Sequence, residues 1–342
     1  YPLRRQRQMC IETELVSYTL ISLTVAGTNI SYGNTISSST KLDGRPSNIP
    51  EDYIATPRGY AHPECIVTIE EGETVKSDGK IAKADGSERS IKGCGYTQYT
   101  KYGEEISSSN LEINLNNRAI GGWEASISHQ LPRDNGVRKI VGEWTVPHNP
   151  RSVGRQTLFL FNSIQTYSPI IIQPVLGFNQ DGAVGPQWSI ASWAVGPNLC
   201  TNGYCKTGNT TVQPGDIVRG TLTRDMPVGI DPQSVKKWLI TISVLRNGVE
   251  TGSQNLNVEL PDSNYRSFDE AVYETYDAET CGQISLLDNL SMLNTKFATK
   301  ELSWRNGPGV GPAESLIYDH KCGVQTNIDR GWTSEIYYGA SN

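Results

Sequence analysis

The sequence predicts an all-β protein, with a sandwich of two sheets as the expected architecture. Short runs rich in Val, Ile, Thr, Tyr and Trp recur along the chain, separated by Gly, Pro, Asn and Asp. Only residues 284–294 have a pattern that favours a helix, and this segment is too short for a helical bundle. A chain of 342 residues can bury a sizeable core in one or two domains. These observations favour an antiparallel β-sandwich.

The clearest strands lie in the second part of the chain. Their β-branched and aromatic residues suit a pleated, half-buried surface, and turn residues bound each run. We expect strands over residues 139–146, 157–161, 169–176, 216–223, 238–244 and 268–276.

The composition changes near residue 115 and predicts two segments. All seven Trp residues lie between Trp123 and Trp332, whereas residues 31–48 form a loose stretch rich in Gly, Ser and Asn. Polar residues at 107–110 and 114–117 are typical of a linker. We therefore place a β-rich N-terminal segment at 1–115 and the main sandwich at 116–342. The first segment is interpreted as an accessory domain, a pro-segment or extra strands of one larger sandwich.

Charge and hydropathy argue against two classes of partner. The net charge is -6 and the pI is about 5.4, so the chain lacks the basic surface that nucleic acid requires. No stretch approaches the apolar length of a membrane span. The chain begins with Tyr1 and shows no signal peptide, which is the expectation for a processed chain.

Cysteines and glycosylation sequons predict a secreted, extracellular protein. The seven cysteines leave one thiol over, and Cys10 is the expected odd residue. A turn-forming tetrapeptide separates Cys200 from Cys205, which favours a local bridge. The remaining cysteines suggest two further pairs, Cys65 with Cys94 and Cys281 with Cys322. The sequons begin at Asn29, Asn209 and Asn289.

Several common catalytic sites have no support in the sequence. The four His residues lack the His-Glu-x-x-His spacing, and no Cys-x-x-Cys pair is present, so we expect no metal site. A Gly-x-Ser-x-Gly nucleophile elbow and a phosphate-binding glycine loop are also absent. We therefore expect no cofactor. Glu274 and Asp277 are an odd number of residues apart, which does not match the alternating carboxylates of a β-sandwich glycosidase.

Gln173 and Glu274 are the best remaining candidates. Gln173 lies within the apolar residues 169–176, where an unpartnered amide costs about 1 to 3 kcal/mol. Counting by twos places Glu270, Val272, Glu274 and Tyr276 on one strand face, so we expect Glu274 to face a groove or solvent. The competing interpretation is a hydrogen-bonded core amide and an exposed strand carboxylate.

The order of short motifs resembles the catalytic domain of the glutamic peptidases, or eqolisins, over about half of the chain. No single motif is specific, but their order and spacing match. In sequence they are Gly121-Gly122-Trp123, Val146-Pro147, Phe159-Leu160-Phe161, the strand with Gln173, a strand from Trp188 to Trp193, Pro214-Gly215-Asp216-Ile217, and Glu270 to Glu274 before an acidic stretch and Cys281.

This resemblance implies a concanavalin-like jelly roll and a secreted endopeptidase with a polypeptide substrate. Gln173 and Glu274 would be its catalytic pair, with Phe159, Trp188 and Trp193 as candidates for the substrate groove. The sequence also departs from the family pattern. Phe159 stands where the family has Trp, Ser163 stands where it has Asp, and the Trp188 to Trp193 strand lacks the family's acid.

Two other functions fit the same sandwich. A carbohydrate-binding lectin would stack sugar rings on the Trp side chains and bind hydroxyls through Asn and Asp loops. A pseudo-enzyme or toxin-like interaction protein would retain the Gln173 and Glu274 pair without using it. Glycan binding without proteolysis at any pH would favour the lectin.

Overall fold

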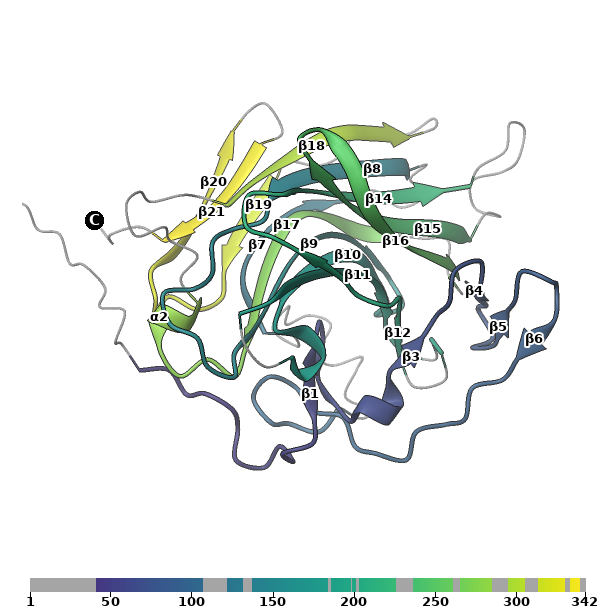
Figure 1. Cartoon of the computed structure of the whole chain (residues 1–342), viewed down its shortest axis with the longest axis horizontal. Helices are drawn as coiled ribbons and strands as arrows, with labels where there is room; N and C mark the ends of the chain where they lie inside the picture. The colour runs from purple at the N-terminus through teal and green to yellow at the C-terminus, as the bar shows by residue number, and fades with distance from the viewer. Residues whose placement is uncertain are drawn as a thin grey trace, which may run out of the picture.

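A computed structural model describes residues 41–106, 122–131, 137–183, 186–197, 199–200, 203–225, 236–260, 265–284, 295–304, 313–329 and 333–338. Two large sheets pack against each other, which confirms the predicted all-β sandwich (Figure 1). The short helical turns are η1 (Pro63–Cys65), η2 (Gln180–Gly182) and α2 (Cys281–Ile284). The remainder of the predicted helix at 284–294 lies outside the described residues.

The first sheet, here called the arched sheet, curves around β1 in Figure 1. Its strand order is β19-β7-β17-β9-β10-β11-β12-β3, with β13 also paired to β11. The bounds are β19 Ala313–Ile317, β7 Trp123–Gln130, β17 Tyr265–Tyr276, β9 Thr157–Thr166, β10 Ile171–Phe178, β11 Trp188–Val195, β12 Tyr204–Lys206, β3 Val67–Thr68 and β13 Thr210–Val212.

The second sheet, here called the outer sheet, covers one face of the arched sheet (Figure 1). Its order is β20-β21-β18-β8-β14-β15-β16-β4-β5-β6. The bounds are β20 Val324–Asp329, β21 Thr333–Tyr338, β18 Thr295–Trp304, β8 Val137–Thr145, β14 Ile217–Arg224, β15 Lys237–Arg246, β16 Val249–Glu259, β4 Thr74–Val75, β5 Ile81–Ala82 and β6 Glu88–Arg89.

The N-terminal segment adds strands to both sheets. β3 pairs in parallel with β12 of the arched sheet, and β4 pairs in parallel with β16 of the outer sheet. A separate hairpin is formed by β1 (Ile54–Thr56) and β2 (Gly59–Ala61). The predicted boundary at 115/116 lies outside the described residues. Before that boundary, the described residues 41–106 contain the short strands β1 to β6.

Strand alternation divides the side chains of the arched sheet between two faces. On β9, Leu158 and Leu160 point into the core between the sheets, whereas Phe159 and Phe161 point to the opposite face. We call this opposite face, which is directed away from the outer sheet, the inner face. It is covered by N-terminal residues rather than by the outer sheet.

The core between the sheets is formed by large apolar side chains from both. Trp144, Val218 and Ile242 of the outer sheet pack in one cluster with Leu176 and Trp188 of the arched sheet. The close approach of the sheets requires a glycine at one point. A Cβ on Gly220 would lie 2.7 Å from Pro174 Cγ and 2.4 Å from Asn162 Oδ1.

Three disulfides join Cys65 to Cys94, Cys200 to Cys205 and Cys281 to Cys322, the pairs that the sequence suggests. Cys10 lies outside the described residues. No helix in the described ranges is long and apolar enough to span a membrane.

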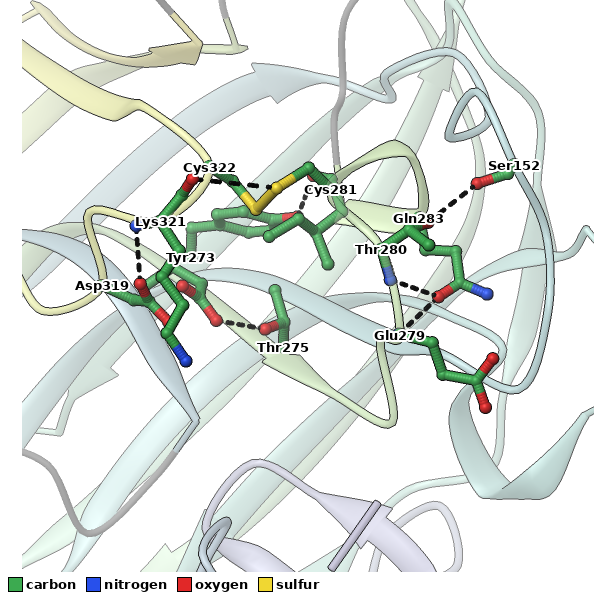
Figure 2. The surroundings of a disulfide bond; sticks show 12 residues. Ser152, Tyr273, Thr275, Glu279, Thr280, Cys281, Gln283, Asp319, Lys321 and Cys322 are labelled. Carbon is green, nitrogen blue, oxygen red and sulfur yellow. Dashed lines mark hydrogen bonds between the residues drawn. A yellow bond between two sulfur atoms is a disulfide. The ribbon is translucent and has the colours of Figure 1, made fainter. Parts of the chain in front are cut away.

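The last disulfide braces the segment that follows β17, as Figure 2 shows. Gln283 Oε1 accepts the backbone N–H groups of Glu279 and Thr280 at 2.5 and 3.1 Å. Tyr273 donates its hydroxyl to the carbonyl of Ile284 at 2.5 Å. The C-terminal end of β17 is thereby fixed at several points.

Candidate active site

Glu274 lies fully buried on the inner face, near the end of β17. Its Oε1 accepts the Tyr276 hydroxyl at 2.5 Å and the Gly122 backbone N–H at 2.9 Å. Its Oε2 is buried and has no hydrogen-bond partner among the described residues. Two donors therefore hold Oε1 in place, whereas no described residue donates to Oε2.

Burial controls the protonation of Glu274. Loss of solvent raises its pKa from 4.5 to about 7, although the hydrogen bonds from Tyr276 and Gly122 act in the opposite direction. The expectation that Glu274 faces a groove or solvent is thus wrong, because the side chain is fully buried. The sequence correctly places Glu274 on the same face of β17 as Val272 and Tyr276, but N-terminal residues cover that face.

Gln173 is also fully buried on the inner face, on β10. It pairs with Trp193 on β11, and Pro174 follows it. The pairing of β10 with β9 is interrupted at Gln173 and Pro174, as expected because proline has no N–H for the ladder. Within the described part of the chain, neither the nitrogen nor the oxygen of the Gln173 amide has a hydrogen-bond partner.

The two candidates share a face but are not cross-strand neighbours. Glu274 pairs with Phe159 on β9, whereas the register of β10 places Gln173 beside Ser163. Four residues along β9 separate these levels, which corresponds to about 13 Å along the strands, and the two strand spacings across β9 add about 10 Å. The side chains must therefore converge across the curved sheet to act on one substrate bond.

Asp269 is the carboxylate at the level of Gln173. It pairs with Ser163, whose hydroxyl donates to its Oδ2. Gln165 Nε2 donates to the same oxygen at 2.8 Å, and Ser128 Oγ donates to Oδ1 at 2.6 Å. Because both oxygens of Asp269 are hydrogen-bonded, this carboxylate is interpreted as a structural group, in contrast to Glu274.

A register shift alters the predicted strand face at the start of β17. The pairing of β17 with β7 shifts between Asp269 and Ala271. Glu270 therefore does not continue the alternation of Val272 and Glu274, and its Oε2 instead lies 3.3 Å from His129 Nε2. Counting by twos fails there because a bulge adds one residue to the strand.

Further buried polar atoms on the inner face have no partner in the described ranges. They include Trp193 Nε1 on β11 and Gln180 Oε1, which lies over Gly177. Gln180 holds its nitrogen against Ser189 Oγ at 2.6 Å. An unsatisfied buried polar atom costs about 1 to 3 kcal/mol, so a group of them on one face requires an explanation.

The cover is the hairpin β1–β2 with its flanking residues. Tyr53, Ala55 and Tyr60 pack in one cluster with Phe161 and Trp193 of the inner face. The hairpin tip, residues 56–59, is buried. The N-terminal segment therefore closes the surface on which both candidates lie.

Arg58 at the hairpin tip enters this surface as a buried cation. Burial lowers the pKa of its guanidinium, and the Tyr204 side chain of β12 acts in the opposite direction. Among the described residues its Nη2 has no hydrogen-bond partner. Burial of such a group is costly, so the covered arrangement must be held by other contacts.

Three residues, here called the clamp, fasten the hairpin to the end of β17. Tyr60 donates its hydroxyl to Asp277 Oδ1 at 2.7 Å, and Arg45 Nη1 donates to Asp277 Oδ2 at 3.1 Å. Arg45 Nη2 also donates to the Tyr53 carbonyl at 2.6 Å. Asp277 lies only three residues after Glu274, so the clamp connects the cover directly to the candidate site.

The structure separates the expected substrate-groove residues. Phe159 and Trp193 lie on the inner face. Trp188 lies instead in the core between the sheets, 5.1 Å from the Phe178 ring, so the groove role expected for it is wrong. Trp188 and Trp193 are five residues apart on one strand, and an odd separation places them on opposite faces.

The predicted glycosylation and metal sites have the following outcomes in the described residues. Asn29 and Asn289 lie outside the described residues. Asn209 is exposed, and its Nδ2 donates to Asp181 Oδ2 at 2.7 Å. The described ranges contain no group of three or more His, Cys, Asp or Glu that could hold a metal ion.

The sequence analysis did not identify Tyr276 and Gly122 as residues of the site. The spacing of Tyr276, two residues after Glu274 on the same strand face, was the signal that could have identified Tyr276.

Comparisons with known proteins give a distant likeness. No family model and no curated protein sequence matches the chain. Two similar solved structures are scytalido-glutamic peptidase with transition-state analogs, at 12% and 14% identity and TM-scores of 0.40 and 0.39; the matches cover 64% of this chain and 99% and 98% of those chains. A third is SCP-B, a member of the eqolisin family, in complex with the tripeptide Ala-Ile-His, at 11% identity and a TM-score of 0.38, covering 64% of this chain and 99% of that chain. The chain is thus similar to solved structures of the family that its motifs resemble.

Proposed function

We propose that this protein is a secreted endopeptidase in a latent state, with Glu274 as the acid–base group. The observation that carries the proposal is the asymmetry of the Glu274 carboxylate. One oxygen accepts two hydrogen bonds, and the other is buried without a partner among the described residues, on a face that also holds the unpartnered amide of Gln173. General acid–base catalysis needs a carboxylate that is fixed in position and has one oxygen free.

The proposed reaction is hydrolysis by an activated water. Ionised Glu274 takes a proton from the water as its oxygen attacks the carbonyl carbon of the scissile peptide bond. The Gln173 amide N–H stabilises the resulting oxyanion, and a donor of this kind is worth about 2.7 to 4 kcal/mol. Glu274 then gives its proton to the leaving nitrogen, the C–N bond breaks, and the carboxylate is regenerated.

The pH range of this reaction depends on the cover. Burial is the largest cause of the raised pKa of Glu274, which is about 7 in the covered state. Displacement of the hairpin would restore solvent and lower that pKa towards its ordinary value. The uncovered enzyme would then have an ionised base at mildly acidic pH.

We further propose that residues 1–115 act as a pro-segment. The contacts that support this are the packing of Tyr53 and Tyr60 on the inner face and the clamp at Asp277. A polypeptide substrate could reach Glu274 only after the hairpin leaves. The three disulfides support passage through an oxidising compartment before secretion.

The buried tryptophans weigh against the lectin alternative. Stacking of sugar rings needs exposed aromatic faces, but Trp123, Trp144, Trp188, Trp193 and Trp238 are each at most 6% exposed. A glycan-binding surface built on these side chains would need to be uncovered first. The free carboxylate oxygen of Glu274 has no role in that alternative.

The test uses a variant in which the clamp is weakened. Tyr60→Phe with Asp277→Asn removes the hydroxyl donor and the charge that Arg45 contacts, and asparagine tolerates the positive φ of 56° at this position. We call this double substitution the released variant. Cleavage of a denatured protein is measured between pH 2 and 7 in this background.

Gln173→Ala, Glu274→Gln and Asp269→Asn are then added one at a time. We expect Glu274→Gln to abolish cleavage and Gln173→Ala to reduce it by roughly 10² to 10³. Asp269→Asn should retain turnover if its carboxylate is structural. If Asp269→Asn abolishes cleavage and Glu274→Gln cleaves like the released variant, Asp269 is the catalytic acid and the assignment of Glu274 is wrong.

A further inference from the structure

The hydroxyl of Tyr276 is placed to fix the Glu274 carboxylate. The two residues lie on the same face of β17, and Tyr276 donates to Glu274 Oε1 at 2.5 Å. The Gly122 backbone N–H lies 2.9 Å from both the Glu274 oxygen and the Tyr276 hydroxyl oxygen. The three groups form a closed triangle that leaves Glu274 Oε2 outside it.

Packing of Tyr276 and the close backbone approach of Gly122 hold these three groups in place. Tyr276 is fully buried, and its ring packs edge-on against Phe159 at 6.1 Å and against Tyr60 of the hairpin at 5.3 Å. A Cβ on Gly122 would lie 2.3 Å from the Thr275 carbonyl oxygen. Only glycine therefore lets this N–H come so close to Glu274.

We infer that Tyr276 is a positioning residue that selects Oε2 of Glu274 as the oxygen that exchanges protons. The inference rests on the proposed function and adds a specific residue to it. Burial raises the pKa of Tyr276 well above its ordinary value, so its hydroxyl stays a neutral donor over the working range. Oε1 is then permanently occupied, and proton transfer to and from water takes place at Oε2.

Other charged and titratable groups also face Glu274. Lys101, beside β7, lowers its pKa, and Glu124 on β7 raises it. Tyr204 on β12 interacts electrostatically with Glu274 across the inner face. Lys101 and Glu124 form an ion pair at 2.6 Å. Because their charges have opposite sign, their effects on the pKa of Glu274 oppose each other. Among the groups that favour the ionised carboxylate, the Tyr276 hydroxyl lowers the pKa of Glu274 the most.

The experiment is a titration of the Glu274 carboxyl by carbon NMR in the full chain with labelled glutamate, assigned with Glu274→Gln. Tyr276→Phe removes one donor to the ionised form. We expect the midpoint to rise by roughly 1 to 2 pH units, the equivalent of one hydrogen bond to a charged group. Tyr273→Phe is the matched control. Tyr273 is adjacent to Glu274 in the sequence, but it lies on the opposite face of β17 and donates its hydroxyl to the carbonyl of Ile284.

An unchanged midpoint in Tyr276→Phe, or an equal rise in Tyr273→Phe, would overturn the inference. Circular dichroism confirms that each variant is folded before titration. The proposed function is tested separately in the released variant, where Tyr276→Phe should shift the pH profile of kcat upwards with little change in KM. A raised NMR midpoint in a chain that cleaves no peptide would count against the proposed function alone.

Discussion

Tyr60 and Asp277 join the covering hairpin to the strand that carries Glu274. The Tyr60 hydroxyl donates to Asp277 Oδ1 at 2.7 Å, although the two residues are 217 positions apart in the sequence. Arg45 lies 5.0 Å from the centre of the Tyr60 ring and pairs with the same aspartate. The cover and the candidate catalytic residue are thus coupled through one short segment of the chain.

Weakening of this contact should open the hairpin. The released variant, Tyr60→Phe with Asp277→Asn, is expected to increase amide hydrogen exchange at residues 54–61 by at least tenfold, because about 1.4 kcal/mol of lost contact energy has that effect. Glu51→Gln is the control, since it removes an exposed ion pair with Arg155 near the same hairpin. Equal exchange in the control and the released variant would show that the clamp does not hold the cover.

Opening of the hairpin should expose Trp193 and leave Trp188 buried. Trp193 contacts the hairpin cluster, whereas Trp188 is in the core between the sheets. We expect acrylamide to quench more tryptophan fluorescence in the released variant than in the parent. Trp193→Phe should remove much of that gain, and Trp188→Phe should not. A gain that depends on Trp188 would mean that the sandwich itself has loosened.

The stability of the protein should fall as the pH rises through the titration of Glu274. The folded state binds this proton more tightly than the unfolded state, because the pKa is about 7 in the folded protein and 4.5 for an ordinary glutamate side chain. The contribution of Glu274 to stability is therefore largest below pH 4.5, and about 3 kcal/mol of that contribution is lost between pH 4.5 and 7.

Chemical denaturation at several pH values measures this slope. Glu274→Gln keeps the hydrogen-bond acceptor for Tyr276 and removes the titration, so its stability should vary less over this range. Glu51→Gln, at an exposed position, should keep the slope of the parent. A slope that persists unchanged in Glu274→Gln would assign the effect to another group.

Gly122→Ala should disturb the site through the backbone. The added Cβ would meet the Thr275 carbonyl oxygen at 2.3 Å and Tyr276 Cζ at 3.1 Å, so the N–H must move away from Glu274. We expect a loss of about 1 to 3 kcal/mol in the free energy of unfolding. Gly95→Ala is the control, because nothing lies within 4 Å of its Cβ position. Equal stability of the two variants would show that the strand absorbs the change.

The sequence predicts the strands of the site better than their surroundings. Local alternation correctly separates Phe159 and Phe161 from Leu158 and Leu160, because a period of two is a property of each strand alone. The same rule applied to Trp188 and Trp193 would have separated them as well. It fails at Glu270, since a bulge cannot be read from residue types.

The burial of Glu274 could not be predicted, because it depends on contacts far apart in the sequence. The residues that cover it precede it by more than 200 positions, and nothing in their local pattern indicates the surface on which they pack. Tyr276 was visible in the sequence at two residues from Glu274. The Gly122 N–H, which donates to both side chains, comes from a segment more than 150 positions earlier and could not be predicted from the local pattern.

The central claim is that Glu274 provides acid–base catalysis once the inner face is uncovered. The most direct measurement is kcat/KM for hydrolysis of an unfolded polypeptide by the released variant, with and without Glu274→Gln, at mildly acidic pH. We predict a loss of at least about 10² on substitution, the lower range for general acid–base catalysis. Equal kcat/KM values for the two proteins would contradict the assignment of Glu274.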